Sequence, residues 1–374
     1  MTKQPLKTKL LNATTDNIKT VVEALKQGDV VGLPTETVYG LAGNALRDES
    51  IAKIFLFKSR PSFDPLIVHV PETLTSCQAL ADAEIINLMA MSQPQISTCD
   101  KLIQLFWPGP LTLIFPKHER ISDLVTSSLP TVGLRSPSHP VAQQVLKLSG
   151  LPLAAPSANQ FGRISPTKSQ HVIEELGEFL NYCLEGGECS VGLESTIATV
   201  NLQGEVSVLR PGGVSLEALE SCLEKSFRGL HTELGLPSVA SHSPMAPGLL
   251  ESHYAPKKQM FRLETRFQEF DFKWLKENFA GLKAENEELS LLSPFPLSAE
   301  IHRRALKNFN RVNFHYLAED ENDSLTAAHT LFSKLRELDS NPSALILCEL
   351  PQSDKALWPA IRDRLTRASK KWSL

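Results

Sequence analysis

The segment "KSRPSFDPLIVHV", residues 58–70, places two cations ahead of an apolar run that ends on a histidine. The run "PLIVHV" has the length and branched side chains of a buried strand, and the residues near 48–57 predict a helix. Lys58 and Arg60 therefore fall between a helix and a strand, where lysine offers a point charge and arginine a fork for phosphate or carboxylate. The alternative is a solvated turn, because cations are favourable at any helix C-terminus.

The same alternation of helix and strand continues on both sides of this segment. Strands are predicted at 30–35, 111–115, 131–136, 151–159, 195–200 and 206–211, and helices at 16–29, near 99–106, near 140–148, at 167–177 and at 216–223. We expect Asp16 to cap the first helix, and Ser165 followed by Pro166 to begin the helix at 167–177. The pattern predicts an α/β domain with a largely covered, mixed sheet.

Residues 231–258 contain several Pro, Ser and Gly and little periodicity, as linkers do. The chain is therefore expected to form a first domain over 1–230, a linker over 231–258 and a smaller α/β domain over 259–374. In the last part, strands are predicted at 260–264, 288–293, 311–317 and 343–350, and helices at 323–338 and 356–369.

Composition narrows the class of protein. A chain of 374 residues is too long for one ordinary core, and a formal net charge of -4 argues against a surface covered in basic residues for nucleic acid. Six cysteines without a Cys-x-x-Cys pair indicate a reducing compartment. Because no apolar stretch approaches the ~18 residues of a membrane span, we expect a cytoplasmic protein.

The familiar nucleotide and zinc motifs, G-x-x-x-x-G-K-[ST], G-x-G-x-x-G and H-E-x-x-H, are absent. Instead, polar segments follow the ends of the predicted strands: "LPTETVYGLAGNAL", "KSRPSFDPLIVHV", "WPGPLTLIF", "TVGLRSPSHP", "LAAPSANQFGRISPT", "GLESTIATV" and "VLRPGG". Ligands of α/β sheets bind where such loops converge. The sequence therefore predicts one large site.

Single residues in these segments allow two interpretations each. Arg135 ends an apolar strand and needs a partner, which a structural ion pair or an anionic ligand would supply equally well. His69 could donate to a substrate carboxylate, although a lone strand histidine is more often a core residue. Glu194, with Ser195 and Thr196, could help to bind a metal, but entry into a strand is the favoured interpretation.

The hydroxyls and the amide of "APSAN" and "SPT" could bind phosphates or a small amino acid, and ordinary turns use the same residues. No pair of residues forms a convincing Ser-His-Asp or Cys-His set. Covalent catalysis therefore has no support in the sequence.

In their order, these segments resemble the YrdC-domain family, and the added second domain resembles the two-domain form of that family. The resemblance covers about 15–215 and continues through "APGLLESHYAP" in the linker. It implies a twisted open mixed sheet with a concave cleft, a smaller Rossmann-like C-terminal domain, and a linker that crosses the active site.

The resemblance further implies a nucleotidyltransferase that joins L-threonine, bicarbonate or CO2, and ATP into threonylcarbamoyl-AMP, releasing pyrophosphate with Mg²⁺ as cofactor. The product would serve modification of the tRNA adenosine next to the anticodon, through a downstream transferase complex. Binding of tRNA or double-stranded RNA by the chain itself is only weakly indicated.

The family's site residues fall on positions of this chain. Lys58 and Arg60 match the catalytic cations. The ATP side is implied at Lys58, Arg60, Asp64, Thr131, Ser157, Asn159, Ser165, Arg210 and Tyr254; the L-threonine side at Thr37, His69, Arg135, Ala155 and Ser195. No metal ligand is implied. Two positions depart from the family pattern, since Asp64 stands where asparagine is more usual and Phe161 where a small residue is common.

Two other functions are alternatives for a chain with these segments. A double-stranded RNA-binding module without this activity would use phosphate contacts, but the acidic composition and the lack of interleaved aromatic and basic residues speak against it. A domain acting on carbamoyl phosphate, as in hydrogenase maturation, would require cysteine pairs that the chain lacks.

Overall fold

The computed structural model describes residues 8–223, 253–278 and 288–372. Most of the predicted linker, 231–252, lies outside the described residues. By its internal contacts the chain divides into two compact units: Met1–Phe161 with Ser165–Leu250, and Gly162–Ile164 with Glu251–Leu374. The short segment Gly162–Ile164 therefore belongs with the C-terminal part of the chain.

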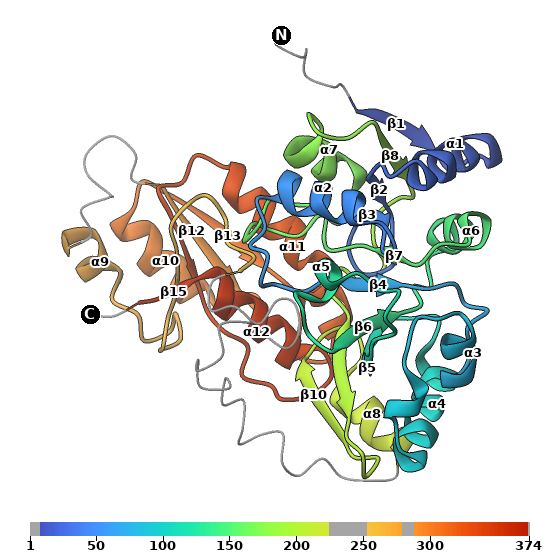
Figure 1. The fold of residues 1–374 in the computed structure, drawn as a ribbon. Coiled ribbons are helices and arrows are strands. Elements are labelled where there is room, and N and C mark those ends of the chain that lie inside the picture. Colours follow the sequence, from blue (N-terminus) through green and yellow to red (C-terminus); the bar gives the residue numbers. More distant parts are fainter. Residues whose placement is uncertain (1–7, 224–252, 279–287, 373–374) are drawn as a thin grey trace. The chain divides into compact units, whose positions relative to one another are not determined.

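The first unit is built on a ten-stranded mixed sheet with the order β1-β8-β2-β3-β7-β4-β6-β5-β9-β10 (Figure 1). Its strands are β1 (Lys9–Asn12), β2 (Val31–Leu33), β3 (Gly40–Asn44), β4 (Ile67–His69), β5 (Leu111–Pro116), β6 (Thr131–Arg135), β7 (Leu153–Ala154), β8 (Tyr182–Glu185), β9 (Thr196–Val200) and β10 (Val206–Arg210). The sheet contains both parallel pairs, such as β4 with β6, and antiparallel pairs, such as β5 with β6. The predicted mixed α/β sheet is confirmed.

Eight α-helices and one 3-10 helix of this unit lie in the described residues: α1 (Thr15–Lys26), α2 (Asp48–Lys58), α3 (Cys77–Asp82), η1 (Leu88–Ala90), α4 (Gln93–Phe106), α5 (Asp123–Thr126), α6 (Pro140–Ser149), α7 (Ser169–Leu176) and α8 (Leu216–Leu223). The apolar face of α1, with Ile18, Val21 and Leu25, joins Val145 and Leu146 of α6 in one buried cluster. A larger cluster forms the remaining core of the unit. Burial of these faces provides the main stabilisation of the sheet.

Two predicted helix caps are wrong. The hydroxyl of Thr14, not Asp16, accepts the capping hydrogen bond of α1 from the backbone N of Asn17, at 3.4 Å. Asp16 lies inside the first turn, where its charge still favours the helix N-terminus. Ser165 does not cap α7, whose N-cap residue is Lys168.

Helix α4 begins at Gln93, six residues before the predicted start near 99. Ser92 caps it with a hydrogen bond from Gln95, and Pro94 occupies the first turn. Proline is compatible with that position because its missing N–H would have no partner there.

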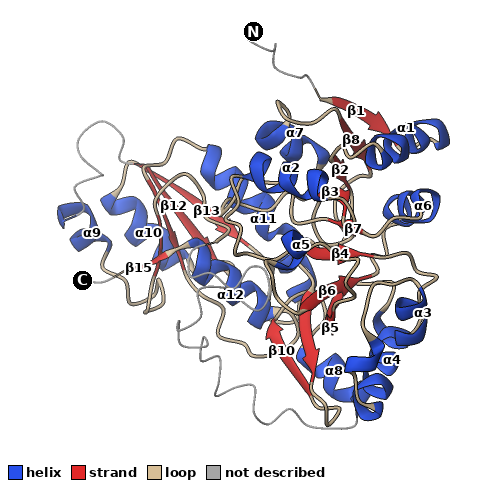
Figure 2. Ribbon diagram, viewed as in Figure 1, coloured by secondary structure: helices blue, strands red, loops and turns tan. Residues whose placement is uncertain are grey.

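The second unit has a five-stranded parallel sheet with the order β13-β12-β14-β11-β15. Its strands are β11 (Met260–Arg262), β12 (Glu288–Ser293), β13 (Arg311–Tyr316), β14 (Leu345–Cys348) and β15 (Lys370–Lys371), and its helices are α9 (Phe272–Asn278), α10 (Ala299–Asn308), α11 (Ser324–Ser340) and α12 (Trp358–Ala368). Figure 2 labels three of these strands, β12, β13 and β15. The four predicted strands and both predicted helices of this part are present. A parallel sheet with alternating helices is the expected α/β arrangement.

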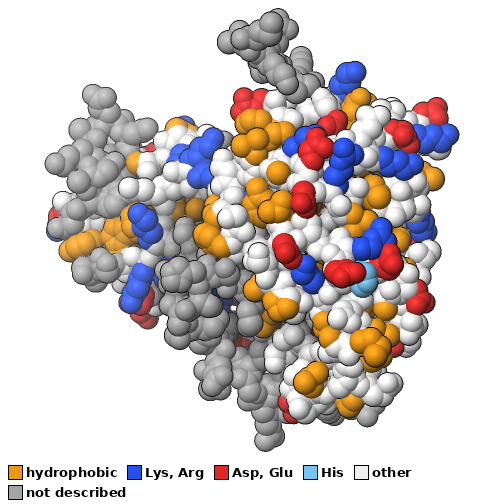
Figure 3. Space-filling view, in the orientation of Figure 1, with side chains coloured by type: hydrophobic (Ala, Val, Ile, Leu, Met, Phe, Trp, Pro, Cys, Tyr) orange, Lys and Arg blue, Asp and Glu red, His pale blue; other side chains and the backbone are white. Residues whose placement is uncertain are grey.

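On the face shown in Figure 3, basic and acidic side chains of the described residues are interspersed. Within the described ranges, no helix combines the length and the apolar character that crossing a membrane requires.

Gly212 allows a close approach of two backbone segments beside the strand pair β9–β10. A Cβ atom at this position would lie 2.4 Å from the carbonyl oxygen of Glu194 and 2.4 Å from the carbonyl carbon of Ser195. We expect Gly212→Ala to lower the free energy of unfolding by about 1–3 kcal/mol, because backbone atoms would have to shift. Chemical denaturation measures this, with Gly133→Ala as control, since a Cβ at Gly133 meets nothing closer than 3.4 Å. Equal stability of the two variants would contradict the expectation.

Candidate active site

The ends of four central strands meet at one edge of the first unit's sheet. Strands β4 and β6 are parallel and end on His69 and Arg135, which are directly paired in the register. Strand β5 is antiparallel to β6 and parallel to β9, so Leu111 and Thr196 begin their strands at this same edge. The topology therefore gathers loops that are far apart in the sequence.

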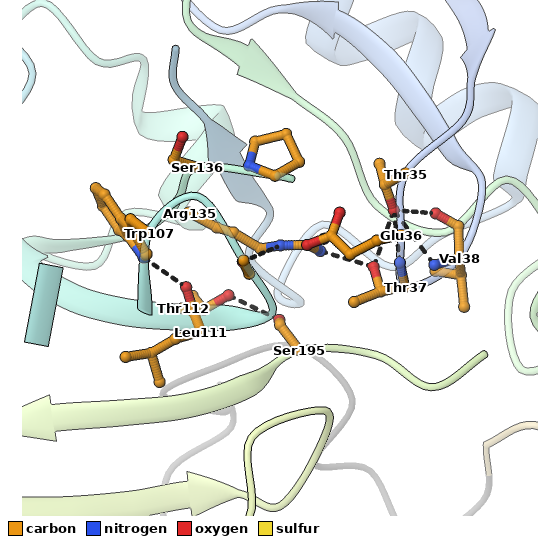
Figure 4. A network of polar contacts seen from close by, with 12 residues as sticks. Thr35, Glu36, Thr37, Val38, Trp107, Leu111, Thr112, Arg135, Ser136 and Ser195 are labelled. Atoms are coloured by element: carbon orange, nitrogen blue, oxygen red, sulfur yellow. Dashed lines mark hydrogen bonds and ion pairs between the residues drawn. The ribbon is translucent and has the colours of Figure 1, made fainter. Parts of the chain in front are cut away.

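Arg135 is a buried side chain at this edge, with 4% exposure and three polar partners. Its Nε donates to the carbonyl of Gly109 at 3.2 Å and its Nη1 to the hydroxyl of Thr37 at 2.7 Å (Figure 4). Its Nη2 lies 2.7 Å from Oε1 of Glu36, and both side chains of this ion pair are buried. The structural ion pair considered for Arg135 is thus present, and Thr37, which is also expected on the L-threonine side, contacts Arg135 directly.

Glu36 was not identified from the sequence. One feature of the sequence could have pointed to Glu36: it is an acidic residue inside "PTETVYG", between two apolar segments. A carboxylate that is buried in such a place needs a partner. Sequence alone did not show that the partner is Arg135, which lies 99 positions further along the chain.

Ser195 connects the residues expected on the two sides of the site. Its hydroxyl lies 2.7 Å from that of Thr112 (Figure 4). Its carbonyl oxygen accepts from Nη2 of Arg210 at 2.9 Å. Arg210 ends β10 and is 4% exposed. Ala155 follows β7 at the same region of the sheet, and its backbone N–H donates to the carbonyl of Ile67 at 3.0 Å.

His69 is buried and neutral. Burial, reinforced by the nearby charge of Arg135, lowers the pKa of His69 from 6.5 to about 3. A neutral imidazole carries no charge toward a carboxylate near neutral pH, although it still offers one N–H donor.

The pKa of His69 predicts acid sensitivity of the fold. The unfolded chain binds this proton below about pH 6.5, whereas the folded state does so only near about pH 3, so stability falls as the pH drops through that interval. We expect this group to reduce the free energy of unfolding by about 2 kcal/mol between about pH 7 and about pH 5. Urea denaturation of wild type and His69→Asn at both pH values isolates the contribution. An identical pH dependence of the two proteins would contradict the assignment.

Lys58 is the last residue of α2 and is 1% exposed. Its Nζ donates to the backbone carbonyls of Ser157 and Asn159. Burial and the neighbouring charge of Arg60 hold the pKa of Lys58 well below its ordinary value. The ammonium group therefore joins the end of α2 to the "SAN" loop.

Arg60 is paired with Asp64. The carboxylate Oδ2 of Asp64 lies 2.8 Å from Nη2 of Arg60, and Nε of Arg60 donates to the Asp64 carbonyl at 3.1 Å. Asp64 is fully buried, and burial raises the pKa of its carboxyl group, against the charges of Arg60, Lys58 and Arg210. Arg60 therefore contacts this buried acid directly, and the charges of Lys58 and Arg210 also act on it.

Two further predicted residues of the first unit make other contacts or lie at other strand ends. Thr131 begins β6, at the opposite end of the strand from Arg135, a separation of roughly 13 Å along the strand. Ser165 donates to Oε1 of Glu194 at 2.6 Å, so Glu194 binds a hydroxyl at the entry to β9.

Tyr254 belongs to the second unit and is 1% exposed. Its ring lies 5.6 Å from that of Phe332, and the guanidinium of Arg364 lies 5.2 Å from its ring centre. Its expected contact with a nucleotide stays a prediction.

Metal-binding groups are sparse. Within 8–223, 253–278 and 288–372, no three His, Cys, Asp or Glu residues gather as metal ligands would. The six cysteines are free thiols, and only Cys222 is partly exposed.

Comparison with known proteins identifies the family. The family model described as "Telomere recombination" (Sua5_yciO_yrdC) matches residues 23–212, and that described as "Threonylcarbamoyl-AMP synthase, C-terminal domain" matches residues 214–370. Threonylcarbamoyl-AMP synthase of Pyrococcus abyssi is 33% identical over 92% of this chain and 92% of its own length. The enzyme of that name from Schizosaccharomyces pombe is 32% identical over 91% of this chain and 84% of its own.

The fold agrees with these relatives. The crystal structure of P. abyssi Sua5 complexed with L-threonine aligns with a TM-score of 0.78 and 29% identity, over 98% of this chain and 100% of the other. The two-domain match, the sequence identity and the fold lead to one conclusion: this chain belongs to the threonylcarbamoyl-AMP synthase family of ATP-using, nucleotidyl-transferring enzymes.

Proposed function

We propose that this chain makes threonylcarbamoyl-AMP and pyrophosphate from L-threonine, bicarbonate or CO2, and ATP. The observation that supports this best is the concentration of buried cations in the first unit. Burial raises the pKa of the Asp64 carboxyl group, and the charges of Lys58, Arg60 and Arg210 all lower it. Arg210 binds the carbonyl of Ser195, which lies at the same edge of the sheet as Arg135. Cations held in a low-dielectric site attract anionic ligands strongly.

The proposed reaction needs no side-chain nucleophile. The ammonium group of threonine releases a proton to solvent, and the resulting amine adds to CO2 and loses a second proton to form a carbamate. A carbamate oxygen then forms a bond to the α-phosphorus of ATP, and the bond from that phosphorus to pyrophosphate breaks. Two anions must be held in contact, and alignment of bound reactants can supply ~7 to 11 kcal/mol. The chain's contribution is therefore positioning and charge compensation.

The cations take separate roles in this proposal. Arg135, with Thr37 beside it, binds the threonine carboxylate, while His69, Ser195 and the Ala155 backbone complete that side. Lys58, Arg60 and Arg210 compensate the phosphates and the charge that develops on pyrophosphate. The remaining ATP-side residues are proposed to be Asp64, Thr131, Ser157, Asn159, Ser165 and Tyr254.

Both arginine sites already hold an internal carboxylate. Arg60 is paired with Asp64 and Arg135 with Glu36. A bound phosphate or amino acid must share or replace these partners, because a buried cation contacted by two anions would carry excess negative charge. Binding therefore requires local exchange of ion pairs.

Mg²⁺ is proposed to arrive on the ATP phosphates. Among the described residues no carboxylate cluster is available for it, and this ion commonly keeps its waters and binds through substrate phosphates. When bound, it would offset phosphate charge. No residue of this chain is assigned as its ligand.

The amino acid pocket should reject valine more strongly than serine. A hydrogen bond to the threonine hydroxyl can reject valine strongly, whereas the missing methyl of serine changes binding by only ~1 to 3 kcal/mol. We expect serine to be the better competing substrate. Pyrophosphate release measured with threonine, serine and valine tests the ranking, and faster turnover of valine than of serine would contradict it.

The direct test of the function is pyrophosphate release from ATP and bicarbonate as a function of threonine. We expect release that depends on threonine, with threonylcarbamoyl-AMP detected as the second product. Absence of threonine-dependent release at every Mg²⁺ concentration would overturn the proposal. Salt-sensitive binding of duplex RNA without any ATP turnover would instead favour the RNA-binding module.

The cellular setting follows from the product. A reactive mixed anhydride would have to pass to a transferase complex that places the threonylcarbamoyl group on the tRNA adenosine. We place both steps in the cytoplasm.

A further inference from the structure

Glu36 is a buried carboxylate to which the proposed reaction gives no task. It lies between β2 and β3, and its side chain is 5% exposed. The backbone around it is fixed, because its carbonyl accepts from the N–H of Val191 at 2.7 Å and the Thr35 hydroxyl donates to the Val38 carbonyl at 2.6 Å. Its position is therefore set by the loop.

The contact of Glu36 with Arg135 leaves bonding capacity on both groups. Oε1 of Glu36 lies 2.7 Å from Nη2 of Arg135, yet in the described part of the chain neither Glu36 oxygen accepts an aligned hydrogen bond, and Nη2 donates none. A carboxylate accepts several hydrogen bonds, and leaving a buried charged group unsatisfied is costly. The pair is held by charge, and both groups keep unused hydrogen-bonding capacity for the donors and acceptors of a ligand.

We propose that Glu36 binds the α-ammonium group of the amino acid substrate. This inference rests on the proposed function. An α-amino acid carries a carboxylate and an ammonium group on one carbon, which are the charges opposite to those of Arg135 and Glu36. On binding, the two charge pairs exchange partners: Arg135 takes the substrate carboxylate, and Glu36 takes the substrate ammonium.

The exchange makes Glu36 a specificity-determining residue. A carboxylic acid ligand that has no ammonium group must displace Glu36 from Arg135. Glu36 would then be buried without a cation, which is strongly unfavourable. A zwitterion replaces both partners at once. Glu36 therefore selects ligands that bear the amine on which the carbamate is built.

The test uses calorimetric binding to the full chain, with a non-hydrolysable ATP analogue present and absent. The two ligands are L-threonine and the analogue in which a hydroxyl replaces the ammonium group. Glu36→Gln keeps the shape of the side chain and removes its charge, and Glu36→Asp keeps the charge. Glu72→Gln removes a carboxylate that is 38% exposed and pairs with Lys147, and serves as control.

We expect Glu36→Gln to weaken threonine binding by about ten- to a hundredfold, the range for a hydrogen bond to a charged group. Binding of the hydroxyl analogue should be unchanged or tighter, because Glu36 no longer competes for Arg135. Glu36→Asp should retain part of the preference for threonine, and Glu72→Gln all of it.

A purely structural role makes a different prediction, since it would weaken both ligands alike. The role of Glu36 is overturned if folded Glu36→Gln prefers threonine over the hydroxyl analogue as strongly as the wild type does, while the wild type binds threonine. That result leaves the proposed function intact. Failure of the wild type to bind threonine or to release pyrophosphate overturns the proposed function, and with it this inference.

Discussion

Replacing Arg135 with leucine is expected to lower kcat/KM for threonine by a factor on the order of a hundred or more. The substrate carboxylate would lose its charged fork, and Glu36 would be left buried without its cation. Steady-state pyrophosphate release over a range of threonine concentrations measures the effect. The KM for ATP should change much less, because the phosphates are assigned to other cations.

Controls separate binding from folding. Arg135→Lys keeps the positive charge and loses the fork, so it should fold and still bind threonine weakly. Arg120→Leu removes an arginine that is 49% exposed and paired with Glu84, and should leave kinetics unchanged. A folded Arg135→Leu protein with wild-type kcat/KM for threonine would rule out the carboxylate assignment.

Replacing Lys58 with methionine is expected to lower kcat/KM for ATP by about 10²- to 10³-fold, the range for loss of one positioned group that stabilises transition-state charge. The ammonium group is 1% exposed and also holds the carbonyls of Ser157 and Asn159. The substitution thus removes a cation and the donor that fixes the loop. Methionine retains much of the buried aliphatic volume.

Lys53 provides a matched control on the same helix. It lies five residues before Lys58 in α2, and its side chain is 29% exposed and pairs with Asp29. Lys53→Met should leave ATP kinetics within about twofold of wild type, since surface ion pairs contribute little. Equal effects at the two positions would show that loss of charge alone, rather than position, determines ATP use.

The strands that flank the site could be predicted because their apolar runs are long and their ends polar. β4, β5, β6, β9 and β10 fall within or close to the predicted ranges. β3 was missed because its sequence "GLAGN" contains two glycines, which weaken a strand pattern. Gly40 nevertheless fits closely there, since an added Cβ would lie 3.1 Å from that of Ala155 and one of the two segments would have to shift slightly.

The limits of local reasoning show most clearly at Ser165 and Arg135. Ser165 followed by proline has the composition of a helix start, but its hydroxyl binds Glu194 from a distant loop. Arg135 was expected to need a partner, and that partner, Glu36, became visible only once the sheet brought β6 beside the loop after β2. Tertiary contacts decided both cases, and no local pattern contains them.

The same limit applies to the charge state of the site. The sequence indicated cations between the predicted helix near 48–57 and the strand that follows it. It did not indicate that Lys58 and Arg60 would be buried and already bonded to carbonyls and to Asp64. Burial depends on which elements cover the loop. It is therefore a property of the fold that the segment alone does not reveal.

The central claim is that buried cations of the first unit hold the amino acid and the triphosphate together. A crystal structure of the full chain with L-threonine and a non-hydrolysable ATP analogue tests it most directly. We expect the threonine carboxylate on Arg135 and the phosphates within hydrogen-bonding distance of Lys58, Arg60 or Arg210. Phosphates bound away from all three cations, or a threonine carboxylate that makes no contact with Arg135, would contradict the account.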